Sequence, residues 1–407
     1  MSGRSLEEWL SYIEGQHPNN IELGLDRCSL VLQKLQIKRP ANKVITVAGT
    51  NGKGSTCAML TEYFINDGLN VGTFTSPHFL KFNERIAING IPVLDEIICE
   101  AFSVIEKLRG SIELTYFEFN TLAAFYIFSL QELDYWVLEI GLGGRLDSVN
   151  MLDADIAIVT SISLDHTDWL GNSLDQIAIE KSGIARKDCL LISGVVNPPA
   201  TIESNALQIG AILKQKNVHF SFSVEADHWS WKGGSVEFRR LSFPKLPIEN
   251  AATVVAALVF SDVAPTEDKL NAMFEKVSLL GRFQTIKSNP NVIIDVAHNP
   301  EAATELAKQV AKLGVRPIAV CGMLEDKDFS SVIDILSDLF SAWYFADLNV
   351  LRGAKASTLA KHVSPSLCFT SVSDAFSAAE VRAIECNLPI VVFGSFHTVA
   401  DYLEKNS

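Results

Sequence analysis

Short apolar runs and amphipathic stretches follow one another along the whole chain. Continuous apolar runs, which are typical of buried parallel strands, lie at 43–48, 71–75, 135–140, 155–162 and 190–193. Stretches with apolar residues at helical spacing separate or follow them, at 6–16, 25–35, 56–68, 95–108, 115–132, 174–184 and 247–260. Strands that alternate with helices predict right-handed crossovers and a mostly parallel α/β sheet.

The pattern changes at 218–243, where alternating residues flank Gly233 and Gly234, and this indicates a small β-hairpin region. The segment 76–90 suits a functional loop better than a core element. After about residue 284 a second series begins, with strands expected at 292–297, 317–323, 343–346 and 390–394 and helices at 300–313, 331–340, 373–385 and 398–405. This series predicts a second, Rossmann-like α/β domain.

The chain has 407 residues, more than one hydrophobic core usually supports. We therefore predict an N-terminal domain at 1–279, a linker at 280–284 and a C-terminal domain at 285–407. A hydrophobic content of 48% and a charged content of 20% are those of an ordinary globular protein.

A net charge of −14 argues against general binding to nucleic acid or to a membrane surface. The seven cysteines are scattered without a CxxC pair, which favours reduced thiols and argues against a zinc site. The N-terminal stretch is amphipathic and charged rather than a signal peptide, and no apolar run reaches about 18 residues. We therefore expect a cytoplasmic protein.

The segment KVITVAGTNGKGST at 43–56 carries the first sign of chemistry. An apolar strand runs into a glycine-dense turn and then into a helix, as in phosphate-binding loops. Glycines let the backbone N–H groups approach an anion closely, and Lys53 would reach the β- and γ-phosphates of a nucleotide. The match to GxxxxGK[ST] is imperfect, because Val47 and Gly54 replace a glycine and a hydroxyl residue. A glycine turn with a solvated lysine is the alternative.

Acidic and basic side chains follow the neighbouring strands. Glu139 ends one predicted strand, and Asp165, His166 and Asp168 follow the next. Ligands gather at the carboxyl ends of strands in open α/β sheets, so we expect these residues at the edge that carries the phosphate loop. A strand-terminal acid in such proteins commonly binds Mg²⁺, whereas His166 alone is as often a structural hydrogen-bonding residue. Asp295, His298 and Asn299 take the corresponding place in the second domain, which we expect to close over the nucleotide.

Eleven blocks in order make the chain resemble the dihydrofolate synthase/folylpolyglutamate synthase family of the Mur ligase superfamily. They are GTNGKGS at 49, TSPHFLKFNERI at 75, LTYFEFNTLAA at 114, LEIGLGGRLDSVN at 138, TSISLDHTDWLG at 160, IAIEKSGI at 177, ENAA at 249, GRFQ at 281, DVAHNP at 295, GMLEDKD at 322 and GSFHTVA at 394.

The resemblance implies an ATP-dependent amide ligase that acts through an acyl phosphate. Its substrates would be dihydropteroate, reduced folates and L-glutamate, and its cofactors ATP and two Mg²⁺ ions. Phosphorylation is needed because a free carboxylate has only oxide as a leaving group. We also expect a monomer.

The resemblance assigns roles residue by residue. It places ATP at Gly49, Thr50, Asn51, Gly52, Lys53, Gly54, Ser55, Asn250, Arg282 and Asp295. It places Mg²⁺ at Ser76, Glu139 and His166. It implies a carbamylated Lys181, where the pattern alone would favour a surface lysine, and catalytic roles for Lys53, Lys181, His166 and His298. It assigns the pterin-containing substrate to Thr115, Phe117, Gly144, Arg145, Leu146 and Asp147, although aromatic residues in LTYFEF are more often core.

Three alternatives stay open. The first is a folylpolyglutamate synthase without dihydrofolate synthase activity, but the segments LTYFEF and GGRLDS argue against it. Another Mur-type ligase would usually carry an additional N-terminal domain, for which there is no room before Gly49. A nucleotide-binding switch would have no use for Glu139, His166 and Lys181 together.

Overall fold

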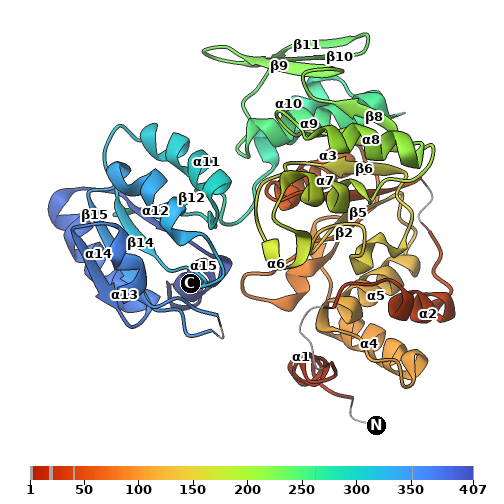
Figure 1. Cartoon of the computed structure of the whole chain (residues 1–407), viewed down its shortest axis with the longest axis horizontal. Coiled ribbons are helices and arrows are strands. Elements are labelled where there is room, and N and C mark those ends of the chain that lie inside the picture. The colour runs from red at the N-terminus through yellow and green to blue at the C-terminus, as the bar shows by residue number, and fades with distance from the viewer. Residues whose placement is uncertain (1–2, 18–21, 40–41, 262, 351, 407) are drawn as a thin grey trace. The chain divides into compact units, whose positions relative to one another are not determined.

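The computed structural model describes residues 3–17, 22–39, 42–261, 263–350 and 352–406. The chain divides into two compact units, Met1–Ser278 and Leu279–Ser407 (Figure 1). Each unit has its own hydrophobic core. The predicted two-part α/β organisation is confirmed. The exact limits of the independently folding domains, with a linker at 280–284, stay a prediction.

Strands of the first unit that join its main sheet are mostly buried apolar runs. They are β1 (Lys43–Ala48), β2 (Val71–Phe74), β3 (Ile86–Ile88), β4 (Ile91–Pro92), β5 (Tyr135–Glu139), β6 (Ile156–Val159), β7 (Leu190–Ser193) and β8 (Ile212–Gln215). Within the described residues their order is β4-β3-β2-β5-β1-β6-β7-β8. The pairs from β2 to β8 are parallel, and β3 and β4 are antiparallel additions at one edge.

The segment 76–90, which we expected to be a functional loop rather than a core element, contains regular structure in its second half. The short helix η1 (Phe82–Arg85) and strand β3 lie there, β3 pairs with β4 just beyond it, and Phe82 and Ile86 are buried in the core. Asn89 and Gly90 both have positive φ, at 50° and 74°, and join Ile88 to Ile91 in a two-residue turn. Asn-Gly is a strong signal for such a turn, because both residues tolerate the left-handed conformation.

Helices of the first unit cover the main sheet. They are α1 (Leu6–Glu14), α2 (Asp26–Leu35), α3 (Lys53–Asn66), α4 (Asp95–Arg109), α5 (Tyr116–Ser129), α6 (Thr167–Leu170), α7 (Leu174–Ser182), α8 (Ala200–Ile209), α9 (Ile248–Phe260) and α10 (Glu267–Lys276). Thr115 and Glu118 form a reciprocal capping box at the start of α5, which fixes where that helix begins.

A separate antiparallel sheet of the first unit lies beside α9 and α10 (Figure 1, top). Its strands are β9 (Phe220–Val224), β10 (Trp229–Gly233) and β11 (Val236–Leu241). The predicted hairpin around Gly233 and Gly234 is confirmed, but β9 extends it to three strands. Trp231 anchors the sheet, since its indole N–H donates to the Ala252 carbonyl of α9 at 3.0 Å.

The second unit repeats the α/β pattern. Its strands are β12 (Gln284–Ser288), β13 (Asn291–Ile294), β14 (Ile318–Cys321), β15 (Ala342–Ala346), β16 (Ser366–Phe369) and β17 (Ile390–Phe393). Its helices are α11 (Pro300–Ala311), α12 (Phe329–Leu336), α13 (Ala356–Leu359), α14 (Val372–Cys386) and α15 (Phe396–Asn406). The sheet order is β12-β13-β17-β14-β15-β16, with only β12 antiparallel among the described strands. None of the helices in the described part of the chain is long and apolar enough to span a membrane.

Candidate active site

Strand β1 lies between β5 and β6, and this order brings the predicted chemistry to one edge of the sheet. Val47 pairs with Glu139, and Ala48 with Val159, so β1, β5 and β6 end at the same level. The chain leaves β1 toward β2, on the far side of β5, and returns later to β6 on the opposite side. This reversal is a topological switch point, where open α/β sheets bind ligands.

The phosphate loop is shaped by two glycines with left-handed backbone. Gly49 has φ of 153° and Gly52 of 85°. A Cβ at Gly49 would collide with the Thr160 hydroxyl, and a Cβ at Gly52 with the Asn250 amide. Asn250, at the start of α9, therefore touches the loop directly. The close approach explains why these positions lack side chains.

Hydrogen bonds tie the loop to the segment after β6. Thr50 N–H donates to the Ser161 carbonyl at 2.9 Å, and Asn51 N–H to the Ser161 hydroxyl at 3.0 Å. The Thr160 hydroxyl donates to the Asn51 carbonyl at 2.6 Å. The segment after β6 thus holds the loop in shape.

Two side chains of the loop are placed to receive phosphate or a cation. Lys53 Nζ donates to the carbonyls of Gly49 and Thr50 at 2.9 and 3.1 Å, so its ammonium curls over the loop. The Ser55 hydroxyl is buried and has no hydrogen-bond partner among the residues that the structure describes. A buried hydroxyl without a partner is costly, and a bound metal or phosphate oxygen would supply the missing interaction.

Ser76 and Glu139 of the proposed metal site are in direct contact. The Ser76 N–H donates to the Glu139 carboxylate at 3.1 Å, and Glu139 is only 4% exposed. His166 has a left-handed backbone, with φ of 51°, at the start of α6. In the described part of the chain no three His, Cys, Asp or Glu side chains gather into a metal site by themselves. The proposed set differs from such a site because its third ligand is a hydroxyl, and its oxygens suit Mg²⁺.

Residues assigned to the pterin-containing substrate lie on two adjacent segments. Phe117, in the first turn of α5, packs so closely on Gly141 that a Cβ there would collide with the ring. Asp147 accepts backbone N–H bonds from Leu142 at 2.8 Å and Val149 at 2.9 Å. Burial raises the pKa of Asp147 to about 6, although these N–H groups and the charge of Lys53 oppose the shift.

Lys181 is buried rather than on the helix surface, with 4% of its area exposed. Gly144 packs against this turn of α7, because a Cβ at Gly144 would meet the Glu180 carbonyl and the Lys181 Cα. Arg145 N–H donates to the Glu180 carbonyl at 2.8 Å, and its guanidinium to the Glu180 carboxylate at 2.7 Å. The predicted substrate loop and the predicted carbamylated lysine are therefore neighbours.

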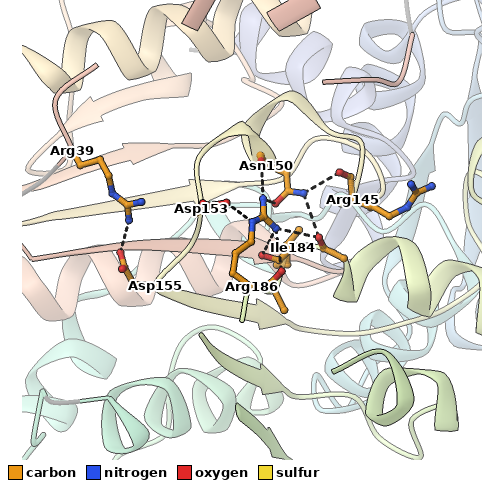
Figure 2. A network of polar contacts seen from close by, with 9 residues as sticks. Arg39, Arg145, Asn150, Asp153, Asp155, Ile184 and Arg186 are labelled. Carbon is orange, nitrogen blue, oxygen red and sulfur yellow. Dashed lines mark hydrogen bonds and ion pairs between the residues drawn. The ribbon is translucent and has the colours of Figure 1, made fainter. Parts of the chain in front are cut away.

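Asn150 and Arg186 hold these two segments together (Figure 2). Asn150 Nδ2 donates to the carbonyls of Arg145 at 2.9 Å and Gly183 at 3.3 Å. Its Oδ1 accepts from Arg186 Nη2 at 3.0 Å, and Arg186 also pairs with Asp153. The sequence patterns single out neither residue. The position of Asn150 at the end of the LEIGLGGRLDSVN block is the one signal that could have found it.

The second unit brings its own predicted residues together after β13. The Asp295 carboxylate accepts from the N–H groups of Phe283 and Ala297, both at 2.8 Å. Burial raises the pKa of Asp295, and the Arg282 charge opposes this shift. His298 Nδ1 lies 2.7 Å from the Val296 carbonyl oxygen, so this contact is a hydrogen bond when Nδ1 carries the proton. These contacts shape a turn and leave the nucleotide role of the residues a prediction.

Comparison with known proteins gives similarity over the whole chain. The Mur ligase middle domain matches residues 47–258, and the Mur ligase glutamate ligase domain matches residues 281–396. The chain is 42% identical to the dihydrofolate synthase/folylpolyglutamate synthase of Escherichia coli, over 98% of this chain and 95% of that protein. It is 39% identical to the enzyme of the same description from Haemophilus influenzae, over 98% and 96%.

Solved structures agree with this similarity. Escherichia coli FolC in complex with DHPP and ADP superimposes with a TM-score of 0.95 at 40% identity, covering 99% of this chain and 98% of that one. A bifunctional folylpolyglutamate synthase/dihydrofolate synthase with Mn, AMPPNP and L-glutamate bound gives 0.93 at 40% identity, with the same coverage.

Proposed function

The chain belongs to the Mur ligase family and, within it, to the dihydrofolate synthase/folylpolyglutamate synthases, and from this premise we propose its reaction. It joins L-glutamate to dihydropteroate, forming dihydrofolate, and to reduced folates, forming folylpolyglutamates, with hydrolysis of ATP to ADP and phosphate. The observation that carries the proposal is a preformed phosphate loop beside the Ser76–Glu139 contact, in a chain that matches such enzymes over nearly its full length.

The chemistry proceeds in two displacements. A carboxylate oxygen of the pteroate or folate attacks the γ-phosphorus of ATP, so that ADP leaves and an acyl phosphate forms. The amine of glutamate then attacks the acyl carbon, phosphate leaves, and the amine loses a proton. Both steps depend on positioning and on stabilising negative charge.

The phosphate loop residues are proposed to bind ATP. Lys53 would exchange the carbonyls of Gly49 and Thr50 for the β- and γ-phosphate oxygens, and the Ser55 hydroxyl would gain its missing partner. Ser76, Glu139 and His166 would hold Mg²⁺, which neutralises charge that develops on the phosphates. Asn250, next to Gly52, Arg282 and Asp295 are proposed as further nucleotide contacts, and His298 as a catalytic group.

Lys181 is proposed to be carbamylated. Its neutral amine would attack carbon dioxide, forming an N–C bond and releasing a proton, so that a buried cation becomes an anion. Burial of a charged ammonium is costly, and a carbamate suits a site next to a second divalent cation. We also propose a cytoplasmic monomer that acts on small molecules and not on nucleic acid.

The substrates test the proposal. Purified protein with dihydropteroate, ATP, Mg²⁺ and L-glutamate should release phosphate in proportion to dihydrofolate, and tetrahydrofolate should also be extended. Activity on tetrahydrofolate alone would leave only the folylpolyglutamate synthase function. ATP binding without phosphate release on any of these substrates would favour a nucleotide-binding switch.

Lys53→Ala tests whether the phosphate loop binds ATP as proposed. We expect turnover to fall by roughly 100- to 1,000-fold, because a charged group that stabilises the transition state is lost. Lys308→Ala, on an exposed helix of the second unit, should leave the rate unchanged. Near-normal turnover of Lys53→Ala would reject the proposed role of the loop.

A further inference from the structure

Two arginines of the first unit are buried, and they differ in how their charge is compensated. Arg85 is 9% exposed and Arg109 is 7% exposed. Arg109 forms a two-pronged pair with Glu106, with Nε–Oε2 at 2.7 Å and Nη2–Oε1 at 2.9 Å, and its Nη1 donates to the Ile112 carbonyl. A carboxylate thus compensates this buried guanidinium, as burial of a charge requires.

Arg85 has no such partner. Its Nε donates to His78 Nδ1 at 2.7 Å, and its guanidinium carbon lies 5.8 Å from the ring centres of both Phe82 and Tyr116. Among the described residues no carboxylate lies within ion-pair distance of it. Burial lowers the pKa of Arg85, and electrostatic interactions with Tyr116, Glu139 and Glu84 oppose the shift. One ring nitrogen and two ring faces compensate far less of a buried charge than a carboxylate does.

The position of Arg85 connects the two halves of the proposed site within the first unit. The Arg85 carbonyl accepts the N–H of Thr75 at 2.9 Å, next to Ser76, which contacts Glu139. Tyr116 lies between Thr115 and Phe117 in the first turn of α5, where the pterin-containing substrate is proposed to bind. Arg85 therefore contacts the segment next to the proposed metal residue Ser76 through its backbone, and the proposed substrate segment through its side chain.

We propose that Arg85 binds a carboxylate of the organic substrate, and that this ligand supplies the anionic partner that Arg85 lacks among the described residues. The inference rests on the proposed function. A planar guanidinium bonds a carboxylate through two parallel hydrogen bonds, and the half-buried Tyr116 ring lies beside the guanidinium, where it could contact the rest of the substrate. The carboxylate comes from dihydropteroate or from L-glutamate, which share this chemistry.

Binding measurements on the full chain with ADP and Mg²⁺ test the assignment. Dihydropteroate is compared with its carboxamide, which keeps the shape and loses the charge, for wild type, Arg85→Met, Arg85→Lys and Arg109→Met. For Arg85→Met we expect roughly 10- to 100-fold weaker binding of dihydropteroate and less than about 2-fold change for the carboxamide, because a charge-assisted hydrogen-bond pair is lost. Arg85→Lys should recover part of the loss. Arg109→Met should bind both compounds like wild type.

The other possible results also support or overturn the assignment of Arg85. A KM for L-glutamate raised about 10-fold or more in Arg85→Met, with unchanged binding of dihydropteroate, supports the same chemistry with glutamate as the source. Equal losses for the acid and the carboxamide, or no loss with either substrate, overturn the assignment. If Arg85→Met does not fold, two other results together overturn the assignment of Arg85. The wild type would bind dihydropteroate and its carboxamide with affinities within about 2-fold, and Arg85→Lys would have unchanged affinities for the substrates. Failure of the Arg85 assignment can be told apart from failure of the proposed function. In the first case the wild type still binds dihydropteroate, whereas in the second it neither binds nor turns over dihydropteroate.

Discussion

Burial of Lys181 makes an ordinary charged ammonium at this position unfavourable. A lysine on a helix in an acidic chain is ordinarily solvated, but Lys181 is 4% exposed and lies against Gly144 of the proposed substrate loop. Burying an unmodified ammonium there would be unfavourable without strong compensation. A carbamate removes the positive charge and turns the side chain into an oxygen ligand.

Removal of the Lys181 side chain should prevent the proposed carbamylation and abolish most of the activity. We expect Lys181→Ala to lose at least about 100-fold in turnover, since a group that stabilises charge at the reacting centre is absent. Added acetate or formate should restore part of the rate by occupying the space of the carbamate. Lys187→Ala, an exposed lysine in the same segment, serves as the control and should remain active. Intact mass of an active enzyme with unmodified Lys181 would contradict the prediction.

Asp147 makes the stability of the first unit depend on pH. Burial raises its pKa from 3.8 to about 6, so the folded state binds a proton between these values that the unfolded state does not. Its favourable contribution is complete below about pH 4 and is lost as the pH rises through about 6. At about 1.4 kcal/mol for each pKa unit, the loss is about 3 kcal/mol.

Comparison with Asp147→Asn isolates this effect, because an amide does not titrate. The unfolding free energy of the wild type relative to the variant should fall by about 3 kcal/mol between pH 4 and pH 7. Urea unfolding at several pH values measures both proteins, and the other titrating groups cancel in the difference. A difference that stays constant with pH would contradict the raised pKa.

At the scale of elements, Asn150 connects the segment after β5 to the end of α7. Its Nδ2 faces two carbonyl oxygens, those of Arg145 and Gly183. Asn150→Asp replaces this donor with an oxygen that faces them, so both carbonyls lose a partner. We expect the unfolding free energy to fall by about 1–3 kcal/mol. We also expect a higher KM for dihydropteroate, because Arg145 is proposed to line that site.

Asn205→Asp is the matched control for this change. Asn205 Nδ2 donates to the Ser182 hydroxyl at 2.7 Å, and that hydroxyl, which donates to the Ala178 carbonyl at 2.6 Å, can rotate to donate to a carboxylate instead. Its unfolding free energy should therefore change by less than that of Asn150→Asp, with an unchanged KM. Equal effects of the two substitutions on KM would show that Asn150 does not position the substrate loop.

The elements that could be predicted from the sequence are those whose signal is local. The strand at 43–48 and the helix after it lie within one short pattern, and the glycines between them predict the turn. The ends of the strands at 135–140 and 155–162 then predict that Glu139 and His166 lie at the same edge, by the general rule for α/β sheets. Ser76 is assigned by the family resemblance alone.

What the sequence could not supply depends on contacts between distant residues. Arg186 reaches Asn150 across 36 positions, and no period or motif records such a pair. The partial neutralisation of Arg85 appears only when Phe82, His78 and Tyr116 are seen around it. The strand β9 was missed as a separate element because Gly233 and Gly234 mark only one of the two turns in its sheet.

At the scale of the whole molecule, the two units have separate hydrophobic cores. Leu122 is fully buried in the core of the first unit, and Leu336 in that of the second. Two cores of this kind predict that unfolding is not a single two-state transition. A calorimetric enthalpy larger than the van't Hoff enthalpy would reveal the two steps.

Cavity-forming substitutions should assign the steps. Leu→Ala in a core typically costs about 2–5 kcal/mol, which in a domain of this size lowers a transition by several degrees. Leu122→Ala should lower one calorimetric transition, and Leu336→Ala the other. An ATP analogue, bound through the phosphate loop as proposed, should raise at least the transition that Leu122→Ala lowers, since ligand binding to the folded state stabilises it. A single transition that both substitutions lower alike would show that the units unfold as one, and the boundary near residue 279 would then separate two compact parts of one cooperative structure.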